Sequence, residues 1–235
     1  KQGKTYGVGG IFLTHGESDA DNADYEAHVA DLMSDYDADL RAITGQKEPI
    51  PFFATQQSTF PDSLGPSVST LAAWRLGATP GYFCVGPRYA YEYAGDSTHL
   101  TPPSYRRLGE KYAEAYFEVA VTKHGWRPLA PTSATLAGQV ITVAFEVPYP
   151  PLAWEETLPR PHQSNWVVWA AGRGFEVSDS TGPRTITGVA IEGSTVRVTL
   201  DGPPTGKDLT VMYALHQDAT GYHGGSPLGR HGQLR

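Results

Sequence analysis

The sequence predicts an α/β domain with a mainly parallel sheet, followed by a small all-β sandwich. In the first half of the chain, short apolar runs alternate with amphipathic stretches at helical spacing. This alternation is typical of βαβ units and of a parallel sheet covered on both faces. From about residue 131 no helical stripe is seen, and short alternating runs take over between Gly- and Pro-rich turns. Such runs are typical of an antiparallel sandwich.

The elements of the first half are expected at defined positions. In chain order they are a strand over 8–13, a helix over 22–45, a strand over 50–57, a helix over 66–77, a strand over 81–86 and a long helix that opens at Pro102 or Pro103. The first helix has a good N-cap in Asn22 and a good C-terminal stop in Gly45. The second begins with Pro and ends with Gly, as helices commonly do.

Four runs in the second half predict strands: "QVITVAFEV", "RTITGVAIEG", "STVRVTL" and "DLTVMYAL". A change of composition after "KHGWRPLAPTSA" places a linker near residues 125–131. We therefore expect two domains, over residues 1–125 and 132–235.

Composition excludes several classes of function. The 235 residues carry a net charge of −7, which argues against a nucleic-acid backbone or an anionic membrane surface as partner. No apolar run approaches the roughly 20 residues that span a bilayer. The single cysteine, Cys84, excludes an internal disulfide and a cysteine-based zinc cluster, and its apolar surroundings predict a buried, inert thiol.

Two polar clusters follow predicted strands, where parallel sheets place their sites. The first is "THGESDADN", over 14–22, and the second is "GDSTHL", over 95–100. In the second cluster Asp96 and His99 stand three apart, so one turn can bring the carboxylate to the imidazole. Such a pair can act as an oriented general base, although the same spacing also occurs in simple helix capping. The first cluster offers donors for an oxyanion.

Together, "THGESD", the helix running from it to Arg41 and the later Asp-x-x-His resemble the SGNH hydrolase (GDSL) superfamily. The similarity is to its sialate O-acetylesterase and acetylxylan-esterase-like branch, and it covers residues 1 to about 122. It implies a flavodoxin-like sheet that carries a Ser-His-Asp esterase, with no metal or organic cofactor. In this chain His15 stands where the family has a Gln. An imidazole also donates one hydrogen bond, so the role is retained with a new pH dependence.

The resemblance implies a role for each matching residue. His99 is expected to act as general base and acid, and Asp96 to orient it. The ring of His15 and the backbone of Gly16 are expected to assist the oxyanion, and Glu17 and Arg41 to support the site.

The nucleophile of the family is a serine in a Gly-x-Ser turn, well upstream of the "HGE" motif. This chain begins after that point, so we expect the serine on a companion polypeptide that packs beside the strand over 8–13. Ser18, Ser58, Ser63 and Ser97 are weaker candidates, because nothing in the sequence around them marks a nucleophile.

The expected function is an esterase that removes acyl groups, most simply acetyl, from a carbohydrate or related polymer. Two alternatives stay open: a non-catalytic scaffold that binds carbohydrate, and an esterase acting on a polyester or lipid. The resemblance also suggests a secreted or periplasmic protein. Trp154, Trp166 and Trp169 fit core packing better than a sugar platform, and the acidic run over 17–26 fits a helix N-terminus better than a calcium site.

Overall fold

The computed structural model describes residues 5–58, 67–96, 98–156, 171–214 and 234–235. The chain divides into two compact units. The described residues of the first unit are 5–57, 67–88 and 105–127, and those of the second are 58, 89–96, 98–104, 128–156, 171–214 and 234–235. Residues 89–104, expected from the sequence in the first domain, are thus grouped with the C-terminal part of the chain.

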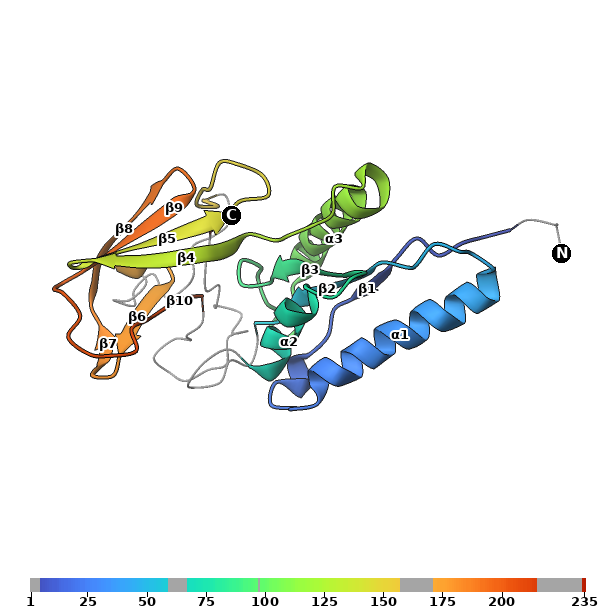
Figure 1. The fold of residues 1–235 in the computed structure, drawn as a ribbon, viewed down its shortest axis with the longest axis horizontal. Helices are drawn as coiled ribbons and strands as arrows, with labels where there is room; N and C mark the ends of the chain where they lie inside the picture. The colour runs from blue at the N-terminus through green and yellow to red at the C-terminus, as the bar shows by residue number, and fades with distance from the viewer. Residues whose placement is uncertain (1–4, 59–66, 97, 157–170, 215–233) are drawn as a thin grey trace. The chain divides into compact units, whose positions relative to one another are not determined.

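The first unit is built on a three-stranded parallel sheet in the order β1-β2-β3 (Figure 1). Its elements are β1 (Ile11–Leu13), η1 (Glu17–Asp19), α1 (Tyr25–Thr44), β2 (Phe52–Gln56), α2 (Val68–Leu76), β3 (Tyr82–Pro87), α3 (Pro102–Tyr116) and a π-helical turn, η2 (Phe117–Thr122). The predicted α/β class with a parallel sheet is confirmed. The flavodoxin-like strand order stays a prediction.

Successive side chains of a strand point to opposite faces of the sheet. Both faces of this sheet are apolar, and helices cover both. On one face the strands pack against α1 and α2 through a buried apolar cluster: Tyr25, Val29, Phe52, Ala54, Ala72, Leu76 and Tyr82. On the other face Phe53 stacks between Phe12 and Phe83, at 5.2 and 5.3 Å between ring centroids. There the α3 rings of Tyr112 and Tyr116 lie against Phe12.

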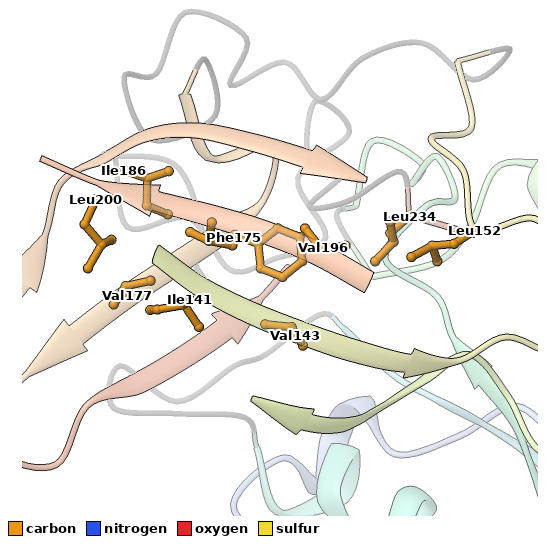
Figure 2. Close-up of a cluster of buried hydrophobic side chains, with 10 residues drawn as sticks. Ile141, Val143, Leu152, Phe175, Val177, Ile186, Val196, Leu200 and Leu234 are labelled. Carbon is orange, nitrogen blue, oxygen red and sulfur yellow. The ribbon is translucent and has the colours of Figure 1, made fainter. Parts of the chain in front are cut away.

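The second unit contains two antiparallel sheets, in the orders β4-β5-β9-β8 and β10-β6-β7. Their strands are β4 (Ala130–Ala137), β5 (Val140–Glu146), β6 (Phe175–Asp179), β7 (Gly182–Arg184), β8 (Ile186–Glu192), β9 (Thr195–Leu200) and β10 (Thr210–Tyr213). Side chains from both sheets form one core (Figure 2), including Val143 of β5, Val196 of β9 and Phe175 of β6. The β-rich second half is therefore as expected, while the sandwich arrangement stays a prediction.

Some element boundaries differ from those expected. β1 begins at Ile11 rather than Val8, because the backbone of Val8 bonds to the side chain of Gln46 instead of to a strand. β4 begins inside the expected linker and was missed, since its side chains are almost all exposed and carry no apolar alternation.

Candidate active site

The turn that follows β1 requires glycine at position 16. Gly16 has φ 111°, a left-handed conformation that other residues rarely adopt. A Cβ on Gly16 would lie 3.0 Å from Tyr25 Oη and 3.1 Å from Ser69 Cβ. Both the backbone angle and the tight space therefore disfavour a side chain here.

A buried hydrogen-bond network holds this turn against α2. The Ser69 hydroxyl donates to the carbonyl of Gly16 at 2.7 Å. The amide of Gln57 in turn donates to Ser69 Oγ at 3.0 Å and to Ser67 Oγ at 2.7 Å. Among the described residues no acceptor is found for the N–H of Gly16. Gly16 is buried, so its N–H is a buried donor without a partner among the described residues.

His15 presents its ring to solvent from the same turn, with its side chain 55% exposed. Its Nδ1 lies 3.1 Å from the hydroxyl of Tyr25, and the two rings are stacked. Burial, with the nearby charges of Asp19 and Glu17, raises the pKa of Tyr25 to about 12. The phenol therefore keeps its proton at physiological pH.

Glu17 is paired with a buried arginine that the sequence did not single out. Its carboxylate lies 2.5 Å from the guanidinium of Arg88, whose side chain is only 1% exposed. Arg88 directly follows β3, and this position at the end of a strand was the available signal. A charge buried this deeply needs a partner, so the ion pair holds the carboxylate of Glu17 against the residue that follows β3.

Arg41, expected to support the site, has its contacts elsewhere. It pairs with Asp37 at 3.0 Å and donates to the carbonyl of Lys47 at 2.9 Å. It lies in the last turn of α1, which at 1.5 Å per residue is about 24 Å along the helix from Tyr25. The arginine beside Glu17 is thus Arg88, and a role for Arg41 in the site stays a prediction.

In the second unit, Asp96 and His99 form a close pair. Asp96 Oδ2 lies 2.7 Å from His99 Nδ1, while Oδ1 accepts the N–H groups of Thr98 and His99 at 3.0 and 2.9 Å. These two backbone bonds, together with the histidine ring, lower the pKa of Asp96 to about 2. The carboxylate is therefore ionised at any physiological pH and can hold the Nδ1 proton of the ring.

Backbone hydrogen bonds hold the residues on both sides of this pair together. Tyr93 and Leu100, both buried, form an antiparallel bridge. Next to it the N–H of Ala94 donates to the carbonyl of His99 at 2.7 Å. The side chain of His99 extends from this turn and is 68% exposed. The arrangement leaves Nε2 open to accept a proton.

None of the described serines is hydrogen-bonded to the His99 ring. Ser18 is exposed, and Ser58 bonds to the hydroxyl of Tyr93 at 2.7 Å. Ser63 and Ser97, like Trp166 and Trp169, lie outside the described residues. Trp154 packs partly buried against the β core, with the guanidinium of Arg173 over its ring.

Within the described ranges no group of three or more His, Cys, Asp or Glu side chains has metal-site geometry. None of the described helices is long and apolar enough to cross a membrane. The structure thus joins His15, Gly16 and Glu17 in one turn and Asp96 to His99 in another.

Residues 1–118, half of the chain, match the family described as "Carbohydrate esterase, sialic acid-specific acetylesterase". The chain belongs to this family. The predicted sialate O-acetylesterase-like branch is therefore confirmed. No curated protein matches the sequence.

A carbohydrate acetylesterase from Xanthomonas citri has a similar structure, with a TM-score of 0.63 at 18% identity. The alignment covers 97% of this esterase-family chain and 47% of that protein. At this identity the likeness shows a shared fold, and the chain spans about half the length of its structural relative.

Proposed function

We propose that this chain supplies the general base and the oxyanion donors of an esterase that removes acetyl groups from a carbohydrate. The observation that carries the proposal is the Asp96–His99 pair, because its geometry matches the task of an oriented general base. The carboxylate is 2.7 Å from Nδ1, and two backbone N–H groups keep it ionised and fixed. Helix capping alone does not require the ring to meet the carboxylate.

In the proposed reaction, His99 Nε2 takes the proton of a serine hydroxyl as its oxygen attacks the ester carbonyl. Asp96 stabilises the imidazolium that forms. The imidazolium then gives that proton to the departing sugar oxygen, leaving an acetyl-serine. Water hydrolyses this intermediate by the same proton transfers in reverse order, which releases acetate and restores the serine.

The oxyanion of each tetrahedral intermediate is assigned to the ring of His15 and the N–H of Gly16. Support comes from the N–H of Gly16, which has no acceptor among the described residues, and from the exposed imidazole of His15. Glu17, fixed by Arg88, is proposed to support this turn. Donors fixed before the reaction starts stabilise developing charge without reorganisation.

We further propose that the nucleophilic serine comes from outside these 235 residues, on a companion segment that packs beside β1. Among the described strands, β1 has a neighbour on one side only, which is β2. Phe12, at its centre, is 49% exposed. An unpaired strand edge favours pairing with another strand. The exposed part of the Phe12 ring, on the face that α3 packs against, is apolar surface that such a segment would cover.

A serine-directed fluorophosphonate probe tests this assignment. The full polypeptide, with whatever segment accompanies it, is labelled and the modified residue is located by peptide mass spectrometry. We expect the label on a serine outside residues 1–235, and we expect His99→Ala to abolish labelling. Labelling of Ser18, Ser58, Ser63 or Ser97 would contradict an external nucleophile.

Complete absence of labelling, together with retained binding of carbohydrate, would favour the non-catalytic scaffold. Hydrolysis of short aliphatic esters without any release of acetate from acetylated xylan would favour the polyester or lipid alternative.

A further inference from the structure

Tyr25 lies directly behind the ring of His15 and shares a hydrogen bond with it. The phenol oxygen and His15 Nδ1 are 3.1 Å apart, and the planes of the two rings are parallel, with an interplanar angle of 1°. Tyr25 opens α1 and is only 6% exposed, so the helix fixes its position. The question is which of the two atoms carries the shared proton.

The surroundings of Tyr25 decide the direction of this bond. A buried hydroxyl needs an acceptor for its proton, and within the described part of the chain His15 Nδ1 is the one polar atom bonded to the hydroxyl of Tyr25. The phenol also stays protonated, because its pKa is raised to about 12. Tyr25 therefore donates, and Nδ1 must present its lone pair.

We infer that Tyr25 is a positioning residue that selects the tautomer of His15 with the proton on Nε2. In a neutral imidazole one nitrogen donates and the other accepts, so a lone pair on Nδ1 leaves Nε2–H as the donor. Among the described residues Nε2 has no partner. It is therefore free to donate to a substrate oxygen, which is the role that the proposed function, on which this inference rests, gives to His15.

Asp19 favours the competing tautomer of His15, with the proton on Nδ1. Its Oδ2 lies 3.9 Å from the same Nδ1, too far for a hydrogen bond but close enough to attract a proton there. If Nδ1 carried the proton, Nε2 would face the oxyanion with a lone pair and repel it. Without the hydroxyl of Tyr25, we expect Asp19 to draw the proton to Nδ1.

Nitrogen NMR of labelled histidine in the resting protein tests the tautomer without any need for catalysis. The His15 signals are assigned by their loss in His15→Gln, and spectra are recorded above the pH at which the ring is protonated. In the wild type we expect Nε2 protonated and Nδ1 bare. In Tyr25→Phe we expect the tautomer population of His15 to shift toward Nδ1–H. In the double variant Tyr25→Phe with Asp19→Asn we expect it to shift back toward Nε2–H. Tyr36→Phe, an exposed tyrosine on the same helix, is the matched control and should change nothing.

Kinetics on an acetylated carbohydrate give a second readout. Tyr25→Phe should lower kcat roughly tenfold at nearly unchanged KM, less than the roughly 10²–10³ that follows outright loss of an oxyanion donor. In the His15→Gln background the same change should have little effect, because an amide needs no tautomer selection.

An Nδ1–H tautomer in the wild type, or an unchanged tautomer in Tyr25→Phe, would overturn the inference. An equal loss of kcat in the His15 and His15→Gln backgrounds would assign Tyr25 a merely structural role and overturn it as well. If the wild type hydrolyses no ester while the NMR result is as expected, the proposed function is wrong and the tautomer assignment stands.

Discussion

At the scale of single residues, each proposed catalytic side chain is held by a partner that sets its protonation. Asp96 is kept ionised by two backbone N–H groups and by His99. The pKa of Asp96 is lowered to about 2. The stability that its carboxylate gives to the folded state is therefore complete above the usual carboxyl pKa near 3.9, and it is lost as the pH falls through about 2. We therefore expect the Asp96–His99 turn to be unchanged between pH 5 and 9 as far as Asp96 is concerned.

Replacing Asp96 with Asn keeps the acceptor for the backbone but puts an amide N–H against His99 Nδ1. The ring must then carry its proton on Nε2, which can no longer take one from serine. By analogy with triads of known effect, kcat should fall by roughly 10²–10⁴-fold, with KM little changed. Steady-state kinetics of Asp96→Asn check this, with circular dichroism to show that the fold is intact. A kcat within about tenfold of wild type would remove Asp96 from the mechanism.

Cys84 makes a second prediction at this scale. Burial raises the pKa of its thiol to about 12, whereas an unfolded cysteine ionises near 8.5. Between these values the unfolded chain loses a proton that the folded chain retains, so the free energy of unfolding should fall as the pH rises above about 9. Urea unfolding between pH 7 and 10 should show that the free energy of unfolding falls less steeply with pH in Cys84→Ala than in the wild type. Equal slopes, or rapid reaction of the native thiol with iodoacetamide at pH 8, would contradict this account.

At the scale of elements, the sequence predicted the helices and strands of the first half. It did not predict which residues at the ends of these elements contact one another. Gly45 ends α1 as predicted, because capping signals are local. The N-cap is Asp24 rather than the predicted Asn22, whose side chain accepts the N–H of Asp24 instead. The contact between Glu17 and Arg88 was missed because the two residues stand far apart in the chain, and nothing in the pattern of either marks the other. Arg41 was preferred on the strength of a family motif, and the structure bonds it to its own helix instead.

The turn after β1 depends on its fit against α1 and α2. Gly16→Ala would place a methyl group 3.0 Å from Tyr25 Oη at a φ of 111°, so strain and displacement are both expected. We expect a loss of about 1–3 kcal/mol in stability and a larger proportional loss of kcat, because both proposed oxyanion donors lie in this turn. Thermal unfolding and kinetics measure the two effects. Gly45→Ala is a useful contrast, since its φ is also positive but its Cβ would meet nothing. Similar loss of activity in both variants would argue against a special role for the turn at Gly16.

The Asp96–His99 segment should depend on the β-rich part of the chain. Tyr89, at the start of this segment, donates to the carbonyl of Leu234 at 2.8 Å, and its ring meets Tyr213 edge to face at 5.3 Å. Tyr89→Phe keeps the ring but loses the hydrogen bond, which should lower stability by about 1 kcal/mol. Denaturant unfolding measures the loss, and Tyr105→Phe, at an exposed position, serves as control. No difference between the two would show that the bond contributes nothing.

At the scale of the whole molecule, the sequence was most informative where periodicity is strong. It predicted an α/β first half, a β-rich second half and the esterase family, and these are confirmed. It did not predict that residues 89–104 group with residues after 128, because such packing joins distant segments through tertiary contacts such as Tyr89–Leu234. Strands β6 and β7 were missed because they are short and lie beside turns, where alternation is hard to recognise.

The central claim is that His99 is the general base of a carbohydrate acetylesterase. Release of acetate from acetylated xylan or an acetylated sialic acid by the full polypeptide tests it most directly, with wild type, His99→Ala and His28→Ala compared side by side. His28 is an exposed histidine on α1 and serves as control. We predict measurable acetate release by the wild type and His28→Ala, and a fall of roughly 10³-fold or more in His99→Ala. Acetate release by His99→Ala at a rate near that of the wild type would contradict the account.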